Sequence, residues 1–327
     1  MVVSDSILEE LQNRSAQWSR KEGAAIHRFI VLAEEKYTSE IDRFLHVYQA
    51  DKRLGPILHP ILEEIREYLL WMRWVGWNVS NLGPALYQDP TAPTQRLALA
   101  MLAYVAGRLI DDGMDNHKIY KGHRKTLVAI VSDRLSRAPD NTGCLQSVFI
   151  GFCLFNYALR RMHDSSFPKC ADIVHQLFEV SSVGALAECY VGPTVSEDLY
   201  RDIIRRKAVA YNMILYKPLL IETEDKLRLQ LLENLATMDE LAQIVNDYGD
   251  IEEDQKGNQM NAFTHGVFDV AALESEVLLR MQELLTSTSR LPSSIQDALA
   301  TMLNNTITAR FLELPVTVKG LHHHSGS

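Results

Sequence analysis

Apolar residues recur at spacings of three and four along most of the chain, which is the period of an amphipathic helix. Residues 6–49 show this pattern, and residues 60–79 are apolar nearly all round, which predicts a buried helix that begins near Pro60. Further helices are predicted over 95–116, 143–164, 168–190, 196–222, 224–254, 267–287 and 293–314. No alternation of period two is long enough to predict a useful strand.

Helix-breaking residues separate these segments. The clearest loop is 81–94, which contains Pro84, Pro90 and Pro93, and shorter breaks fall near 139–141, 165–168, 192–193 and 291–292. The breaks interrupt one continuous helical pattern, so we expect a single all-α domain over 1–319, built as a helical bundle. Residues 320–327, with three consecutive histidines, are expected to be an expression tag.

Composition supports long helices in a soluble protein. Gly and Pro total 27 (16 and 11) in 327 residues, which leaves few helix breakers. The net charge of −9 argues against nonspecific nucleic-acid binding, which needs a basic surface. The four cysteines lack metal-ligand spacing and are predicted to be reduced, packed thiols. We see neither a signal-peptide core nor about 18 consecutive apolar residues, so a cytoplasmic location without membrane insertion is expected.

Three carboxylates follow the apolar run 97–110. Asp111 and Asp115 are four residues apart and therefore share one helix face, while Asp112 lies about 100° further round and can reach the same rim. Unpaired charge at the end of an interior helix is costly, which favours a bound cation there.

A second oxygen-rich face occurs later in the chain. Asn246, Asp250 and Asp254 follow one another at spacings of four, with Asp247 beside them. Hard oxygen ligands of this kind suit Mg²⁺ or Mn²⁺, especially where substrate phosphates complete the coordination shell. A single acidic cluster is more often a solvated surface, but two such faces, each opposing the helix dipole, favour a pair of metal sites. A di-iron site is excluded because His117 and His265 lie outside Glu-x-x-His spacing.

The first motif, "DDGMDNHKIYKG", resembles the first Asp-rich motif of the class I isoprenoid synthases, and most closely that of the trans-isoprenyl diphosphate synthase branch. Lys121 matches the second basic residue of the family motif, whereas Tyr120 stands where the first Arg is expected. The stretch "QIVNDYGDIEEDQKG" is similar to the second motif, with Gln243 in place. Asn246 also makes it similar to the metal motif of terpene cyclases.

Two weaker elements complete the resemblance, which covers about residues 95–265. "GALAECY" resembles the GQxxD element with Ala185 and Glu188 as replacements, and "IIRRKAVAYNMIL" resembles the lysine segment. The resemblance implies Mg²⁺ ions, expected to number three, with Mn²⁺ as an alternative, and a homodimer. The implied metal ligands are Asp111, Asp112, Asp115, Asn246, Asp247, Asp250 and Asp254. The implied residues that bind the prenyl diphosphate are Lys207, Arg206, Lys121, Arg124, Lys256 and Gln243.

The second-substrate elements of the family look degraded. "DKRLGP" at 51–56 poorly matches the GKxxR element that binds isopentenyl diphosphate, and Tyr104 stands where a His or Gln is expected. We therefore expect a terpene synthase that ionises one allylic diphosphate and then cyclises or rearranges the carbocation. Two alternatives stay open: a prenyltransferase that elongates with isopentenyl diphosphate, and a noncatalytic partner subunit.

Small residues one turn before Asp111 predict the length of the substrate. Ala106 and Gly107 leave room below the diphosphate, so a long substrate such as geranylgeranyl diphosphate or longer is expected, with Tyr104 as the floor. Tyr104→Ala should then lengthen the accepted chain. A tryptophan stripe at 71, 74 and 77 could stabilise a carbocation, but packing in the core is the favoured interpretation.

Overall fold

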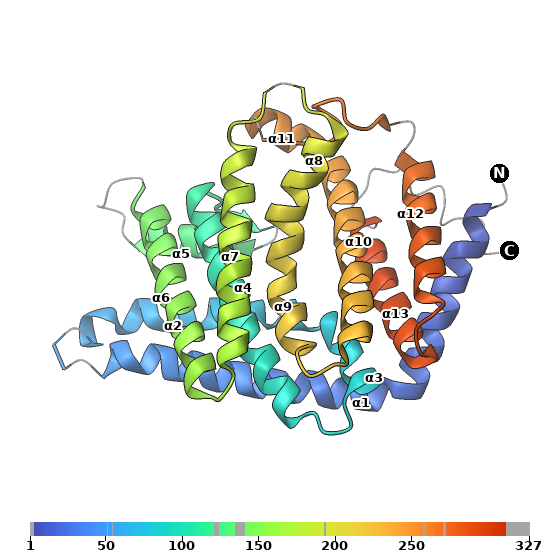
Figure 1. Cartoon of the computed structure of the whole chain (residues 1–327). Coiled ribbons are helices and arrows are strands. Elements are labelled where there is room, and N and C mark those ends of the chain that lie inside the picture. Colours follow the sequence, from blue (N-terminus) through green and yellow to red (C-terminus); the bar gives the residue numbers. More distant parts are fainter. Residues whose placement is uncertain are drawn as a thin grey trace, which may run out of the picture.

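Helices make up nearly all of the computed structural model, which describes residues 3–50, 52–53, 55–120, 124–134, 141–192, 194–257, 259–270 and 273–311 (Figure 1). The long helices are α1 (Val3–Gln49), α2 (Gly55–Trp71), α4 (Thr91–Met114), α6 (Thr142–Asp164), α7 (Pro168–Glu188), α10 (Asp225–Gly249), α12 (Leu273–Thr288) and α13 (Ser293–Phe311). The shorter ones are α3 (Gly83–Leu86), α5 (Leu127–Arg134), α8 (Glu197–Ile204), α9 (Ala210–Leu219) and α11 (Ile251–Gly257). The all-α prediction is confirmed.

Three predicted helices are divided in the structure. The segment predicted over 60–79 begins earlier, at Gly55, and after Trp71 gives way to the 3₁₀ turns η1 (Met72–Gly76) and η2 (Val79–Leu82). The segment 196–222 contains a π-helical turn, η3 (Arg205–Val209), and the segment 224–254 is broken at Asp250. Hydrophobic period alone does not distinguish these turns from α-helix, because their side chains still alternate between core and surface.

A two-residue antiparallel hairpin follows the first acidic motif. β1 (Ile119–Tyr120) pairs with β2 (Arg124–Lys125), with Ile119 opposite Lys125. Two residues per strand are too few to give a period-two signal in the sequence. The hairpin lies between the end of α4 and the start of α5.

The core centres on α4, which packs against α1, α6 and α9. Between Arg96 and Ile110, only Tyr104 and Arg108 are not buried. A helix enclosed on every other side delivers its C-terminal residues to a fixed position, which suits a site that depends on geometry. In Figure 1, α1 runs along the lower edge of the bundle, and the C-terminal ends of α7 and α10 lie together at the top beside α8 and α11.

Of the described helices, α6 is the one whose length and composition would allow it to cross a membrane. It has no charged residue between Thr142 and Leu159, a stretch that the sequence pattern did not single out. In the structure α6 packs against α4, α5 and α7, and 39% of its apolar window is buried.

Candidate functional site

The first acidic motif sits where α4 ends. α4 ends at Met114, and the amide N–H of Asp115 donates to the carbonyl of Asp111 at 3.0 Å. The Asp111 side chain is 40% exposed and Asp115 is also exposed, whereas Asp112 is fully buried. The first and last carboxylates of the motif therefore face outward, while the middle one points into the protein.

Two cationic groups compensate the buried charge of Asp112. Arg108 Nη2 lies 2.9 Å from Asp112 Oδ1, and Arg108 Nη1 reaches Asp111 Oδ2 at 3.1 Å. A hydrogen bond from His117 to Asp112 raises the pKa of that imidazole, and Tyr68 donates to Asp112 Oδ2 at 3.4 Å. Asp112 thus anchors the end of α4, while Asp111 and Asp115 are the outward carboxylates of the motif.

The second acidic motif ends α10 and continues into α11. Asn246 Nδ2 donates to Asp250 Oδ2 at 2.8 Å, which confirms that these two side chains share one face. Asp247 is only 2% exposed, and both of its oxygens accept hydrogen bonds: from Gln243 Nε2 at 2.6 Å, from the Tyr200 hydroxyl at 2.8 Å and from the Ala262 amide at 2.9 Å. Burial raises the pKa of Asp247 to about 7, although these neutral donors lower it.

Asn261 is a site residue that the sequence analysis missed. It is fully buried, and its side-chain amide donates to Asp254 Oδ2 at 2.7 Å and to the backbone carbonyl of Asp247. Its own Oδ1 accepts from the Phe263 amide at 2.9 Å. Asn261 therefore fixes the orientation of the second motif from a loop that follows α11. No periodic pattern marks such a residue, because its role depends on where the loop folds back.

Lys207 and Glu188 form an ion pair between η3 and α7. A Cβ atom on Gly184 would lie 2.4 Å from the Lys207 nitrogen, so the glycine permits a close approach of the two backbones. Ser181 Oγ donates to the Lys207 carbonyl at 2.9 Å, which satisfies a carbonyl in the π turn. Burial works to lower the pKa of Lys207, but Glu188, Asp111 and Asp115 together raise it above its usual value.

Electrostatic coupling shows that the helix ends converge. Partial desolvation and then the neighbouring Asp111 carboxylate raise the pKa of Asp115, while Lys207 opposes the shift and Glu188 adds to it. Glu188 also raises the pKa of Tyr200, the residue that donates to Asp247 of the second motif. Glu188 is therefore within electrostatic reach of Asp115 in the first motif and of Tyr200, which supports the second, and α7 ends at Glu188 near the end of α10 (Figure 1).

Other predicted phosphate-binding residues have different surroundings. Arg206 pairs with Asp202 at 2.9 Å on the exposed side of α8, and the Arg124 guanidinium lies 4.8 Å from the ring centre of Trp71. Gln243 is engaged with Asp247. Lys121 lies outside the described residues, as does the side chain of Lys256. Among the described basic candidates, Lys207 is the one that the structure places against both Asp111 and Asp115.

The space expected beside Gly107 is occupied. A Cβ atom there would lie 2.5 Å from Cε2 of Tyr211, so the ring of Tyr211 fills the position. Ala106 is fully buried, and its carbonyl faces Gly151 of α6 rather than a cavity. Tyr104 stacks on Tyr211, with ring centres 4.3 Å apart. The expected passage is therefore closed by a residue on another helix, which the sequence around Asp111 does not reveal.

The three tryptophans do not form one stripe. Trp77, which follows the 3₁₀ turn η1, is 47% exposed and donates to Glu34 at 2.6 Å. Trp74 packs partly buried against the core. Trp71 lies 5.8 Å from Tyr68 between ring centres, and Tyr68 in turn contacts Asp112, so this tryptophan alone approaches the first motif.

The donor set fits divalent cations shared with a ligand rather than held by protein alone. No three His, Cys, Asp or Glu side chains of the described part of the chain are close enough to hold a metal ion among themselves. Asp111 and Asp115 repel each other, and Asp112 Oδ1 lacks a well-aligned hydrogen bond despite its ion pair with Arg108. A cation beside these carboxylates would relieve the repulsion, and phosphate oxygens would complete its shell.

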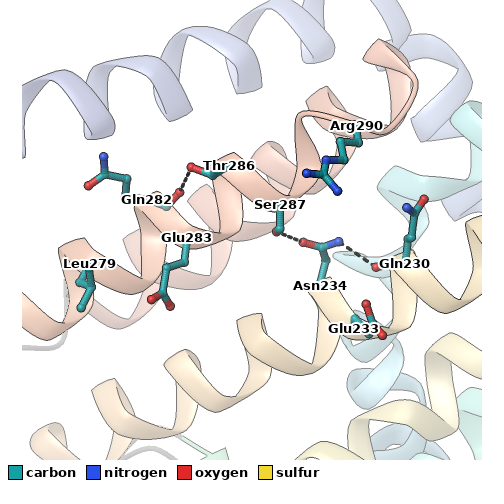
Figure 2. A pocket seen from close by; sticks show the side chains of 9 residues that line it. All are labelled: Gln230, Glu233, Asn234, Leu279, Gln282, Glu283, Thr286, Ser287 and Arg290. Carbon is teal, nitrogen blue, oxygen red and sulfur yellow. Dashed lines mark hydrogen bonds between the residues drawn. The ribbon is translucent and has the colours of Figure 1, made fainter.

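A groove of about 570 Å³ lies between α10 and α12, away from the acidic motifs (Figure 2). Its polar groups largely satisfy one another: Ser287 donates to Asn234, and Asn234 donates to the Gln230 carbonyl at 2.7 Å. Asn234 precedes Asn246 by twelve residues, about 18 Å along the axis of α10. We therefore do not assign this groove to the candidate site.

Comparison with known proteins identifies the fold. No family model and no curated protein matches the chain. Among solved structures, polyprenyl synthase from Caulobacter crescentus CB15, in complex with calcium and isoprenyl diphosphate, is 15% identical and superposes with a TM-score of 0.60 over 91% of this chain and 98% of that one. Geranyltransferase from Helicobacter pylori 26695 is 14% identical, with a TM-score of 0.57 over 84% of this chain and 98% of that one. The chain has the fold of the trans-isoprenyl diphosphate synthases.

Proposed function

We propose that this chain is a metal-dependent enzyme that ionises an allylic prenyl diphosphate, and that it acts as a trans-prenyltransferase. The observation that carries the proposal is the Lys207–Glu188 ion pair, which is within electrostatic reach of Asp115 in the first motif and of Tyr200, the donor to Asp247 in the second. A diphosphate needs both metal ligands and a cation, and this end of the bundle supplies both. The C. crescentus and H. pylori proteins, the latter also solved with magnesium and isoprenyl diphosphate, support the choice of substrate class.

The residues have distinct roles in this proposal. Bound Mg²⁺ ions supply Lewis-acid stabilisation of the diphosphate as the allylic carbon–oxygen bond breaks. Asp111 and Asp115 would hold them on one side, and Asn246, Asp250 and Asp254 on the other. Lys207 would donate to phosphate oxygens, while the buried Asp112 and Asp247 fix the helix ends. The apolar walls of α4 and α9 would exclude water from the carbocation.

Cyclisation without a second substrate is the second candidate, and one observation favours it. The basic element for isopentenyl diphosphate would fall near Arg66, whose Nε donates to Asp42 of α1 at 2.8 Å. Tyr104 occupies the position of a second polar contact and instead donates to Asn212 at 3.2 Å. These contacts leave no basic pair near α4 among the described residues of α2.

Incubation with Mg²⁺ and C10–C25 allylic diphosphates, with and without isopentenyl diphosphate, separates the candidates. A longer prenyl diphosphate formed only when both substrates are present supports the transferase. Hydrocarbon or alcohol released with the allylic substrate alone supports the cyclase. No turnover under any condition, in a folded protein that binds Mg²⁺, would support a noncatalytic partner subunit.

We also propose that the chain forms a homodimer through the outer face of α6 and α7. Large apolar side chains are exposed there: Leu145 (60%), Phe149 (61%), Phe152 (47%), Val180 (41%), Val183 (53%) and Leu186 (61%). Two helices with such a face are suited to an isologous contact, because the same apolar side chains meet each other across a twofold axis.

Sedimentation equilibrium tests this interface. The wild-type chain is expected to be a dimer at micromolar concentration, and Phe149→Glu with Val183→Glu is expected to give a folded monomer. Glu233→Lys, which changes charge at an exposed position of α10 outside this face, is the matched control. A monomeric wild type that associates with phosphatidylcholine vesicles would instead identify the face as membrane-binding.

A further inference from the structure

We infer that Arg108 is shared between the first acidic motif and the ligand. In the ligand-free chain its guanidinium covers Asp111, and once a metal ion takes Asp111 the same guanidinium binds a phosphate oxygen of the diphosphate. This inference rests on the proposed function and adds a cation that was not among the predicted phosphate-binding residues. It makes the binding of metal and the binding of diphosphate depend on each other.

The Arg108 guanidinium bridges two neighbouring carboxylates of the motif. Its Nη2 lies 2.9 Å from Asp112 Oδ1, and its Nη1 lies 3.1 Å from Asp111 Oδ2. Arg108 precedes these residues by four and three positions, so the three side chains meet on one side of the end of α4. A planar guanidinium presents N–H donors in two directions, whereas a lysine ammonium is a single point of charge. One arginine therefore compensates both carboxylates in part.

The two contacts of Arg108 differ in burial. The Asp112 side chain is fully buried, whereas the side chains of Asp111 and Arg108 are 40% and 29% exposed. Attraction between charges is stronger where water is excluded, and a buried carboxylate left without its counter-charge is costly. The contact to Asp111 is therefore the weaker one, which a competing cation would replace. Nη1 is then released, while Nη2 stays on Asp112.

Arg108 faces the same side of the site as Lys207. Burial raises the pKa of Tyr211 most, and the nearby Arg108 opposes that shift. Lys207 precedes Tyr211 by four residues on the segment that packs against α4, and its own pKa, which burial lowers, is raised by Glu188 and Asp111. Two cations from facing helices therefore approach Asp111, one in direct contact and one within electrostatic reach.

A metal ion alone meets a site that already holds a cation. Arg108 occupies one oxygen of Asp111, and a divalent ion placed on that carboxylate would repel the guanidinium. A diphosphate carries negative charge that attracts both, and arginine is well suited to phosphate oxygens because it offers parallel N–H donors. Metal and diphosphate should therefore bind cooperatively, each raising the affinity for the other.

The test measures metal binding and diphosphate binding separately in wild type and Arg108→Gln. Electron paramagnetic resonance of Mn²⁺ gives the metal affinity without diphosphate, and calorimetry in excess Mg²⁺ gives the affinity for inorganic diphosphate. Arg108→Gln is expected to bind Mn²⁺ about fivefold more tightly, because a competing cation is gone. It should bind inorganic diphosphate about tenfold more weakly, because a charged donor is lost. A residue that only held α4 in place would weaken both.

Arg280→Gln on α12 is the matched control. The Arg280 side chain is 27% exposed and pairs with Glu276 at 2.9 Å and Glu283 at 3.5 Å, so the same kind of ion pairs is lost and both affinities should match wild type. Circular dichroism checks folding. If Arg108→Gln does not fold because Asp112 lacks a counter-charge, Arg108→Gln combined with Asp112→Asn is compared with Asp112→Asn alone, and the same two opposite changes are expected.

The inference is overturned if Arg108→Gln binds Mn²⁺ no more tightly than wild type, or if its affinity for inorganic diphosphate is unchanged. A loss of both affinities would give Arg108 a structural role only, and would overturn it as well. If wild type itself binds neither Mn²⁺ nor inorganic diphosphate, the proposed function is refuted, and this inference with it.

Discussion

The two acidic motifs occupy equivalent helix ends, yet each protects its buried carboxylate differently. Asp112 in the first motif faces the Arg108 guanidinium and the imidazole of His117, whose pKa it raises. Asp247 in the second motif faces neutral donors, from Tyr200, Gln243 and the Ala262 amide. A cation compensates charge directly, whereas neutral donors only solvate it, and the pKa of Asp247 accordingly rises to about 7.

The two motifs also differ in which segments of the chain hold them in place. The first motif is anchored within α4 itself, since Arg108 is one turn before Asp112 on the same helix. The second motif is anchored by distant segments: Tyr200 comes from α8, and Asn261 comes from the loop after α11. The first motif can therefore form as soon as α4 is packed, while the second requires most of the tertiary structure.

The largest expected effect comes from removing one outward carboxylate of either motif. Asp111→Asn and Asp250→Asn should each lower diphosphate release about 1000-fold, about 4 kcal/mol, because each weakens charge stabilisation of the leaving group. The assay is phosphate detection with saturating Mg²⁺. Asp133→Asn, which removes an exposed carboxylate paired with Lys125, is the control and should retain activity. Equal activity of Asp250→Asn and wild type would contradict the two-sided site.

The next effect is a pH dependence of stability that comes from Asp247 in the second motif. The folded pKa of Asp247, about 7, exceeds the value of about 3.9 in an unfolded chain, so the folded protein binds this proton more tightly. Its contribution to the free energy of unfolding is therefore full below pH about 4 and falls as the pH rises toward 7, by at most about 4 kcal/mol.

Urea denaturation of the metal-free protein between pH 4 and 8 measures this contribution. The free energy of unfolding of wild type minus that of Asp247→Asn should fall as the pH rises from 4 toward 7. The same comparison for Asp133→Asn gives the background expected of an exposed carboxylate. A wild-type minus Asp247→Asn difference that stays constant across the range would refute the shifted pKa.

A smaller effect is expected at pH 7, where the loss of stability on replacing each buried carboxylate by an amide should differ between Asp112 and Asp247. Asp112→Asn should destabilise the fold by about 2 kcal/mol, because Arg108 loses a buried counter-charge while it still contacts Asp111. Asp247→Asn should cost about 1 kcal/mol or less, since Gln243 can reverse its amide and present its oxygen. Chemical denaturation of both variants measures the two losses of stability. A larger loss for Asp247→Asn than for Asp112→Asn would contradict the prediction.

The smallest effect concerns the two tyrosines that donate to these carboxylates. Tyr200→Phe removes a 2.8 Å hydrogen bond to Asp247 and should cost about 1 kcal/mol. Tyr68→Phe removes a 3.4 Å contact to Asp112 and should stay within about 0.5 kcal/mol. Thermal denaturation of both variants measures the two losses of stability, and the comparison is direct because each substitution removes one tyrosine hydroxyl group. Equal losses would show that the two carboxylates depend on their hydroxyl donors alike.

Much of the fold was predictable because long helices carry a strong periodic signal. The bounds of α4, α6 and α7 fall within about four residues of those predicted. The divisions at η3 and Asp250 were not predictable, since a π turn has nearly the same hydrophobic pattern as the α-helix around it. The interpretation of Gly107 as open space was incomplete for a related reason: a glycine admits either a ligand or a neighbouring side chain, and here Tyr211 occupies the space.

The sequence by itself determined the helical class, the order of the acidic motifs and the residues that share a face within each helix, because these follow from local periodicity. Only the tertiary structure decided which carboxylate of each motif is buried, which side chains contact it, and that Lys207 pairs with Glu188. Those properties depend on side chains from helices far apart in the chain, such as Tyr211 against Gly107 and Asn261 against Asp254. Burial and electrostatic coupling arise between helices, so they are fixed only when the helices pack.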